Sequence, residues 1–393
     1  MRRCEYAVLG LGAMGSAAFY QLAKAGADVI GIDRYNPPHP HGSTHGESRI
    51  TRRAIGEGMA YVPLVSRSHE IWRDLEGQTG QTLLSEVGCL IISRADDAVE
   101  RPGRTGFIQR TREAANRYSI PHEILDANAI RQRFPQFAVA DDEIGYFEPG
   151  AGYVEPERCV AAQLTLGKAL GGETVLDTKV TAIEHTPDGV LLKTTSGDIL
   201  AQKLVLSAGS GASGLLGGAF ETILSPTRQS MHWFELEPEL RQEWASGPVF
   251  IWPHGESADD FFYGFPEVEG LGAIKIADEA YGNPIDPDQV DRNVPLSASD
   301  EKYVRHLAPR LKGVSARRHK AVTCLYTATP DSAFVIDWHP NDERILVVSP
   351  CSGHGFKHSA AIGEIAAQLV TTGQSAIDIS AFSLSRFPAF SGV

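Results

Sequence analysis

The stretch AVLGLGAMGSAAFYQLAKAGADVIGID, residues 7–33, decides the fold of the first part of the chain. Its apolar start predicts a buried strand, and residues 10–15 then spell the glycine pattern GxGxxG. A helix pattern continues to Lys24, and the apolar residues 29–32 predict a second strand. Strand, glycine loop, helix and strand in this order are typical of a βαβ unit that binds a dinucleotide at the helix N-terminus.

The residues of the loop suit a pyrophosphate. Gly10 permits a tight turn, Gly12 lets the backbone approach the phosphates, and Gly15 allows close packing of the helix. Ala13 and Met14 complete the loop, and we assign all five residues to the cofactor site.

Asp33 ends the second predicted strand, where its carboxylate can accept hydrogen bonds from ribose hydroxyls. The same carboxylate would repel a 2′-phosphate, so the sequence disfavours NADP and leaves NAD and FAD open. We also assign Arg34, the next residue, to the cofactor site.

Composition limits the remaining possibilities. The 393 residues suggest two or three domains, and 42% hydrophobic content is enough for large cores. A net charge of -13 disfavours nucleic acids and anionic membrane surfaces as partners. No apolar run is long enough to span a bilayer, and the five cysteines show neither metal-ligand spacing nor a disulfide pattern. We therefore expect a cytoplasmic protein without a metal.

The rest of the chain alternates between helical and strand patterns. Helices are predicted over 61–76, 98–118, 156–170 and 359–369. Strands are predicted at 88–92, 174–176, 203–207 and 345–349, with a hairpin formed by 179–183 and 190–194. The aromatic segment from Arg228 to about Lys320, with strands at 231–236 and 261–265, predicts an antiparallel sheet that covers the cofactor.

Six stretches in one order make a family resemblance specific. They are PPHPHGSTHGESRITR (37–52), GEGMAYVPL (56–64), YFEPGAGYV (146–154), FFYGFP (261–266), TCLYTATPDSAFVID (323–337) and SGHGFK (352–357). With them the chain resembles the monomeric sarcosine oxidase and N-methyltryptophan oxidase family of flavin amine oxidases over nearly its whole length. The resemblance implies FAD rather than NAD.

The implied fold is α/β plus α+β. It combines a Rossmann-like FAD-binding domain, of the glutathione reductase and p-hydroxybenzoate hydroxylase type, with an antiparallel-sheet substrate domain. We predict that residues 1–85, 150–225 and 320–393 form the FAD-binding domain, and that 86–149 and 226–319 form the substrate domain. The resemblance also implies a monomer.

The resemblance further implies that FAD is attached covalently through a cysteine, and Cys324 holds the position of that cysteine. Without the resemblance, the sequence around Cys324 indicates a small buried hydrophobic residue. A thiolate is nonetheless a suitable nucleophile toward an oxidised flavin. Cys351, next to the SGHGFK loop, is the competing candidate.

The same resemblance assigns the cations. Arg52 and Lys357 would clamp a substrate carboxylate, whereas Arg49, His45 and His354 would lie near the flavin ring. Without the motif of residues 37–52, we would interpret Arg49 and Arg52 as charged loop residues exposed to solvent. The cofactor site would further include Ser43, Val180, Ala208, Gly209, Gly353, Gly355 and Lys357.

Lys275 lies in an alternating apolar segment and is either an edge-strand charge or a functional one. In the family, the matching lysine promotes the reaction with O₂, and a preplaced ammonium would stabilise the negative charge that develops on O₂. Tyr263 and Tyr326 match aromatic residues of the substrate pocket, although cross-strand packing would also explain them.

Three positions depart from the family pattern. Glu279 replaces a pocket histidine, and it could pair with a cationic substrate group, partly neutralise the clamp or face solvent. Arg53 and Ile55 replace the usual histidine and tyrosine in the loop after Arg52. These departures leave the substrate open.

The function implied is FAD-dependent oxidation of a secondary amine, an N-methyl or cyclic amino acid, to an imine that water hydrolyses, while O₂ is reduced to H₂O₂. Two alternatives stay open. One is a flavin amine dehydrogenase that uses another electron acceptor, and the other is an NAD-binding module without amine chemistry.

Overall fold

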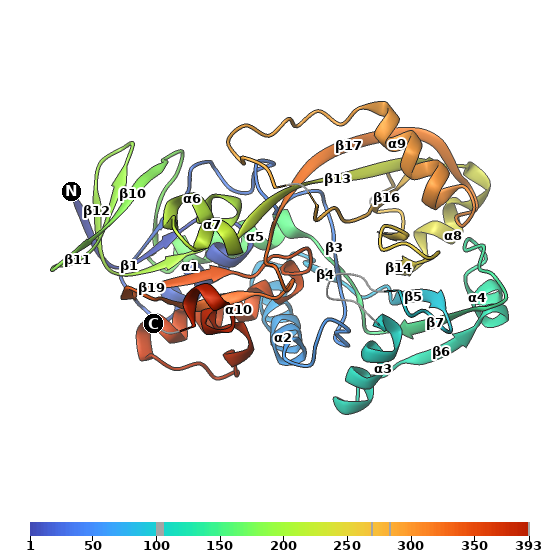
Figure 1. Cartoon of the computed structure of the whole chain (residues 1–393), viewed down its shortest axis with the longest axis horizontal. Helices are drawn as coiled ribbons and strands as arrows, with labels where there is room; N and C mark the ends of the chain where they lie inside the picture. Colours follow the sequence, from blue (N-terminus) through green and yellow to red (C-terminus); the bar gives the residue numbers. More distant parts are fainter. Residues whose placement is uncertain (100–105, 269, 283, 392–393) are drawn as a thin grey trace.

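The computed structural model describes residues 1–99, 106–268, 270–282 and 284–391. Two eight-stranded sheets lie at opposite ends of the long axis, and both termini belong to the side of the first sheet (Figure 1). The helices are α1 (Ala13–Lys24), α2 (Tyr61–Thr79), α3 (Phe107–Arg117), α4 (Ala127–Arg133), α5 (Pro156–Ala169), α6 (Ala212–Leu216), α7 (Phe220–Ile223), α8 (Arg241–Ala245), α9 (Leu296–Lys302) and α10 (Ser359–Thr372).

The first sheet contains the predicted βαβ unit. Its strands are β1 (Arg2–Leu9), β2 (Val29–Ile32), β9 (Glu173–Val175), β10 (Val180–Thr186), β11 (Gly189–Thr194), β12 (Ile199–Leu206), β18 (Val335–His339) and β19 (Asp342–Ser349). The strands β9, β2, β1, β12 and β19 are parallel neighbours in this order. The carboxyl ends of β1 and β12 therefore meet at one edge, where a ligand of a doubly wound sheet binds.

Close backbone contacts fix the helix that follows β1. Gly10 has φ +85, and a β-carbon on Gly15 would lie 1.7 Å from the Gly10 carbonyl oxygen. A β-carbon on Gly363 of α10 would lie 2.2 Å from the β-carbon of Ala17 in α1. Only glycine fits such positions, so the loop and the α1–α10 contact depend on it.

The second sheet has the order β17-β13-β16-β15-β14-β5-β7-β6. The strands are β5 (Cys89–Arg94), β6 (Glu123–Asp126), β7 (Glu143–Glu148), β13 (Ser225–Leu236), β14 (Val249–Pro253), β15 (Phe261–Gly264), β16 (Ala273–Ala277) and β17 (Val314–Ala328). All neighbours pair antiparallel except β14 and β5, which are parallel. A small third sheet joins β3 (Arg49–Thr51), β8 (Gly152–Val154) and β4 (Leu84–Ser85).

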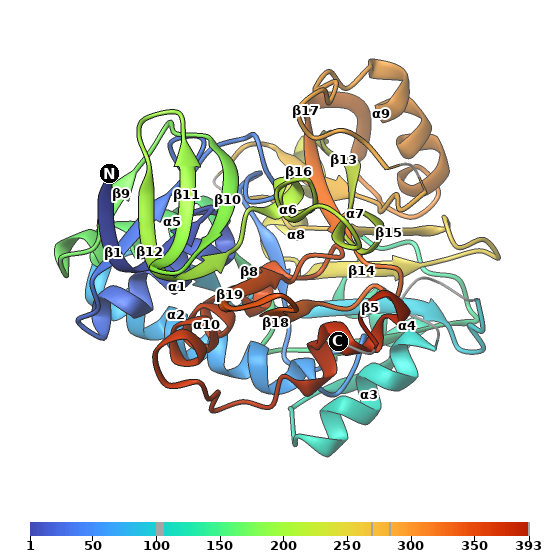
Figure 2. The ribbon, with the colours of Figure 1, turned by 60° about the vertical axis from the view of Figure 1, so that its left-hand side comes forward.

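Figure 2 shows the two long strands β13 and β17 of the second sheet, which pair side by side. The predicted domain ranges place residues 320–328 in the cofactor domain, although these residues pair with β13 in the second sheet. The domain ranges stay a prediction.

One predicted helix was too long. The pattern over 98–118 suggested a single helix, but Ala98 and Val99 are not helical and α3 begins at Phe107. Gly106 precedes it with φ +62, a conformation that ends a helix rather than continues one. Residues 100–105 of that prediction lie outside the described part of the chain.

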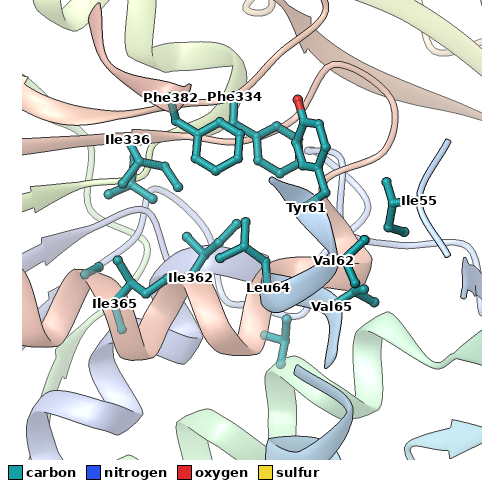
Figure 3. Close-up of a cluster of buried hydrophobic side chains, with 14 of the residues drawn as sticks. Ile55, Tyr61, Val62, Leu64, Val65, Phe334, Ile336, Ile362, Ile365 and Phe382 are labelled. Carbon is teal, nitrogen blue, oxygen red and sulfur yellow. The ribbon is translucent and has the colours of Figure 1, made fainter. Parts of the chain in front are cut away.

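A buried apolar cluster joins α2 and α10 (Figure 3). It includes Tyr61, Leu64, Phe334, Ile362 and Phe382, each no more than 6% exposed. The cluster supports the loops that lead into both helices. Within the described residues, no helix is long and apolar enough to cross a membrane, and no cluster of potential ligands suits a metal ion.

Candidate active site

A cavity of about 630 Å³ opens at the carboxyl edge of the first sheet. Most residues assigned to the cofactor line it: Gly10, Gly12, Ala13, Met14, Asp33, Arg34, Ser43, Arg49, Val180, Ala208, Gly209, Gly353 and Gly355. Gly15, His45, Cys324 and Lys357 lie outside the lining. A roomy cavity at a glycine loop and a helix N-terminus fits a dinucleotide.

Asp33 shapes the phosphate loop. Its Oδ2 accepts a hydrogen bond of 2.7 Å from the Leu11 amide, and its Oδ1 accepts one of 2.8 Å from the Tyr35 amide. The carboxylate therefore supports the loop backbone while it also faces the cavity. Thr44, which the sequence did not single out, contributes Oγ1 at 3.3 Å from the Ala13 amide.

A crossing segment, residues 284–293, reaches from the second half of the molecule to the cavity mouth. Asp288 lines the cavity and pairs with Arg34 and, at 3.1 Å, with Lys179. Arg292 donates hydrogen bonds to the carbonyls of Pro40 and His41. Sequence patterns give no sign of such contacts between remote segments.

Two thiols lie near the same part of the cavity. Cys324 in β17 is buried, with Sγ 3.6 Å from the Ser43 carbonyl oxygen and 3.8 Å from the Arg49 guanidinium. Burial raises the pKa of the Cys324 thiol, and the nearby Arg49 charge opposes that rise. Cys351 lines the cavity, and its Sγ accepts a 3.3 Å hydrogen bond from the Thr327 amide.

Lys275 belongs to an interior strand of the second sheet, since β16 lies between β13 and β15. This position excludes the edge-strand alternative. Its Nζ donates to the Gly46 carbonyl at 2.8 Å and to the Ser48 carbonyl, and it lies 3.9 Å from the centre of the Phe265 ring. Burial lowers the pKa of Lys275 well below the ordinary lysine value, and the Arg49 charge adds to this effect.

The loop of residues 46–48, whose carbonyls contact Lys275, is itself held in place by side chains. Glu157 of α5 accepts hydrogen bonds from the amides of Gly46, at 2.6 Å, and Glu47. Glu47 adopts φ +71, and its carboxylate accepts from Trp233 Nε1 at 3.0 Å and pairs with Lys320. Next to this loop, burial and the Arg49 charge lower the pKa of His45 to about 3.

Arg52 is only 1% exposed, so it is not a solvated loop charge. Its Nη2 lies 2.7 Å from Glu57 Oε2, and Lys357 Nζ lies 4.0 Å from Glu57 Oε1. The two cations predicted to clamp a carboxylate thus meet at one protein carboxylate. Sequence analysis missed Glu57, because a loop glutamate is normally exposed.

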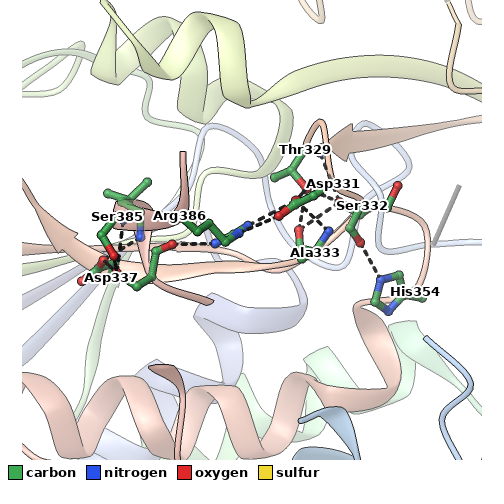
Figure 4. A network of polar contacts seen from close by, with 11 residues as sticks. Thr329, Asp331, Ser332, Ala333, Asp337, His354, Ser385 and Arg386 are labelled. Atoms are coloured by element: carbon green, nitrogen blue, oxygen red, sulfur yellow. Dashed lines mark hydrogen bonds and ion pairs between the residues drawn. The ribbon is translucent and has the colours of Figure 1, made fainter. Parts of the chain in front are cut away.

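His354 lies in the turn that leads to Lys357, and a polar network holds it (Figure 4). Its Nε2 contacts the Ser332 carbonyl oxygen at 3.0 Å, and its own carbonyl accepts a 2.9 Å hydrogen bond from Lys357 Nζ. Asp331 fixes the Ser332 turn through Thr329 and an ion pair of 2.7 Å with Arg386.

Two tyrosines and one carboxylate form another wall. The hydroxyls of Tyr263 and Tyr326 lie 3.3 Å apart, and Tyr326 lines the cavity. Burial, and then the charge of Glu279, raise the pKa of Tyr263 to about 12. The Tyr281 hydroxyl, which sequence reasoning missed, donates to Glu279 Oε2 at 2.9 Å.

Comparisons with known proteins agree with this geometry. The sequence matches the family described as DAO, FAD dependent oxidoreductase, over residues 5–369. The chain belongs to the FAD-dependent oxidoreductase family. This FAD-dependent oxidoreductase is 38% identical over 381 residues to a monomeric sarcosine oxidase of Bacillus sp. (strain NS-129), with 96% of each chain covered.

A second relative confirms the resemblance seen in the sequence. An N-methyl-L-tryptophan oxidase of Yersinia pestis (strain Pestoides F) is 36% identical over 386 residues, covering 97% of this chain and 98% of the relative. The predicted resemblance, the FAD cofactor and the enzyme class are confirmed.

Solved structures confirm the fold of the FAD-dependent oxidoreductase. NikD, an amino acid oxidase of nikkomycin biosynthesis, matches with a TM-score of 0.83 at 23% identity, covering 98% of both chains. Glycine oxidase from Geobacillus kaustophilus matches with a TM-score of 0.78 at 20% identity, covering 98% of this chain and 100% of that one.

Proposed function

We propose that this enzyme oxidises a secondary amine, an N-methyl or cyclic amino acid, to an imine and transfers the electrons to O₂. The observation that carries the proposal is the pair of buried cations, Arg52 and Lys357, that converge within reach of one carboxylate beside the cofactor cavity. Such a pair suits the carboxylate of an amino acid, because the planar guanidinium can bind it bidentately.

FAD, when bound, supplies the acceptor for the two electrons and the hydrogen that leave the C–H bond next to the substrate nitrogen. The protein holds the substrate by its carboxylate, and the tyrosine wall excludes water from the reacting carbon. Water then adds to the released imine, so an N-methyl amino acid gives formaldehyde and a primary amine. O₂ takes up two electrons and two protons to become H₂O₂.

Lys275 is proposed to assist the O₂ step. Its amino group is buried between two carbonyls and an aromatic ring, and the nearby Arg49, whose charge acts on it, lines the cavity. An ammonium in such a site stabilises negative charge that develops on O₂. This placement supports an oxidase over a dehydrogenase that uses another acceptor.

The first experiment measures H₂O₂ release from sarcosine, other N-methyl amino acids and L-proline, and formaldehyde release from the N-methyl substrates, with N-methylpropylamine as the substrate that lacks a carboxylate. We expect turnover only with the amino acids. Substrate oxidation that needs an artificial acceptor and yields no H₂O₂ would favour the dehydrogenase, and no amine oxidation at all would refute the proposal.

We also propose that FAD is bound covalently through Cys324, in a protein that acts as a monomer in the cytoplasm on small amines. The support is the placement of the thiol beside Ser43 and Arg49 at the cavity. Acid precipitation tests the bond: yellow colour should stay in the wild-type pellet and leave the pellet of Cys324→Ala. Cys351→Ala is the matched control, and loss of colour there instead would move the attachment to Cys351.

A further inference from the structure

Glu279 follows β16 on a turn that is fixed from both sides. Before it, the Asp278 carboxylate pairs with Lys302 and lies 3.8 Å from His306 Nε2. After it, the Ala280 amide donates a 2.9 Å hydrogen bond to Gln229 Oε1, and Gln229 Nε2 donates back to the Ala280 carbonyl. The Glu279 side chain therefore starts from a rigid backbone, as a recognition residue needs.

The carboxylate of Glu279 points to the cavity wall rather than away from the molecule. A β-carbon built on Gly353, which lines the cavity, would lie 3.2 Å from Glu279 Oε1, 2.8 Å from the Tyr281 hydroxyl and 2.9 Å from the Tyr326 ring. The Tyr281 hydroxyl donates to Glu279 Oε2 and lies 3.3 Å from the Ser352 carbonyl oxygen. Glu279 is half-buried in this position.

The cations and Glu279 contact different residues of one turn, residues 352–357. Lys357 Nζ bonds to the His354 carbonyl and lies 4.0 Å from Glu57, which also pairs with Arg52. Glu279, Tyr281 and Tyr326 lie against Gly353 instead. A ligand that reaches both groups meets two cations at one point and an anion at another.

From this arrangement we propose that the substrate is an N-alkylated amino acid whose side chain ends in an ammonium or guanidinium group, and that Glu279 binds this second cation. The inference rests on the proposed amine oxidation. The reacting nitrogen itself is a poor partner for Glu279, since a carboxylate beside it would hold it protonated and withdraw the lone pair that oxidation requires.

The test compares substrates that differ in one charge. We pair Nα-methyl-L-lysine with Nα-methyl-L-norleucine, Nα-methyl-L-ornithine with Nα-methyl-L-norvaline, and Nα-methyl-L-arginine with Nα-methyl-L-citrulline. A hydrogen-bonded charge pair predicts that at least one basic member exceeds its neutral partner in kcat/KM by about ten- to a hundredfold. Glu279→Gln should reduce that ratio to near one, whereas Glu256→Gln, at an exposed site, should leave it unchanged.

A binding measurement separates recognition from turnover. In 2-methylthio-6-aminohexanoate a sulfur replaces the reacting nitrogen, and 2-methylthiohexanoate is its neutral partner. The dissociation constants, read from the change in flavin absorbance, should show the same preference in the wild type and lose it in Glu279→Gln. Oxidation of neutral and basic substrates with equal efficiency would overturn this inference and leave the proposed function intact, whereas no amine oxidation would overturn the function itself.

Discussion

At the scale of single residues, each cation of the site already contacts an acceptor of the protein itself, with which a bound ligand would compete. Glu57 stands between Arg52 and Lys357, where the substrate carboxylate is proposed to bind. Two carbonyls hold Lys275. The first arrangement leads to a prediction about the binding of carboxylate ligands, and the second to one about the rate of the reaction with O₂.

Glu57→Gln should tighten the binding of carboxylate ligands, because the amide no longer competes as an anion for Arg52. We expect the dissociation constant of methylthioacetate to fall several-fold and the free energy of unfolding to fall by about 1–3 kcal/mol, since a buried cation loses its partner. Absorbance titration and calorimetry measure the two effects.

The control is Glu70→Gln, which removes an exposed carboxylate 2.7 Å from Arg67. Surface pairs of this kind contribute about 0–1 kcal/mol, so neither quantity should change appreciably. Equal ligand affinity in Glu57→Gln and wild type would show that Glu57 does not compete for the clamp.

Lys275→Met should slow the O₂ step by about 10²- to 10³-fold and leave anaerobic substrate oxidation much less affected. Stopped-flow mixing of the pre-reduced enzyme with O₂ measures the step. Lys168→Met is the control, because it removes an exposed lysine of α5. Equal losses in both variants would contradict a specific role for Lys275.

The pH dependence of the same step has a definite sign. Burial lowers the pKa of Lys275, so its ammonium is lost at a lower pH than that of an ordinary lysine. The wild-type rate with O₂ should therefore fall as pH rises through this lowered pKa, and Lys275→Met should lack that limb of the profile.

At the scale of elements, structure that depends on neighbouring residues could be predicted from the sequence, whereas contacts between remote residues could not. The βαβ unit followed from Gly10 and Gly15, whose conformation and spacing are set within a few residues. The start of α3 was misplaced, since periodicity continues past a helix end that Gly106 determines. Glu57 and Tyr281 were missed because their partners are remote in sequence or buried unexpectedly.

The contact between α1 and α10 gives a prediction about packing. Gly363→Ala adds a methyl group where the Ala17 β-carbon is 2.2 Å away, so it should cost about 1–3 kcal/mol or more and loosen the cofactor. Gly77→Ala in α2 meets nothing within 4 Å and should stabilise by about 0.5–1 kcal/mol. Urea unfolding measures the stability of both variants. Equal unfolding midpoints for Gly363→Ala and Gly77→Ala would refute the argument that α1 and α10 are closely packed at Gly363.

At the scale of the whole molecule, the crossing segment ties its two halves together over the cofactor cavity. Asp288 pairs with Arg34 and Lys179, and all three side chains are 42–47% exposed. Salt screens exposed pairs of this kind. Retention of the cofactor should therefore depend on ionic strength.

Asp288→Asn, made in a Cys324→Ala background where FAD can dissociate, should release FAD about fivefold faster, because exposed pairs contribute about 1 kcal/mol. Fluorescence of the freed flavin measures the rate. High salt should accelerate release from Cys324→Ala alone and have little further effect in the double variant. Equal salt sensitivity of both proteins would show that these ion pairs do not retain the cofactor.

The order of strands in the first sheet also has a consequence for biosynthesis. The phosphate loop is translated first, but β12 lies between β1 and β19, and α10 closes the packing of α1. A growing chain on the ribosome therefore carries its glycine loop long before the cavity around it can form. Capture of FAD belongs to the finished polypeptide, and a premature stop codon before α10 would yield a protein that has the complete nucleotide motif and cannot keep its nucleotide.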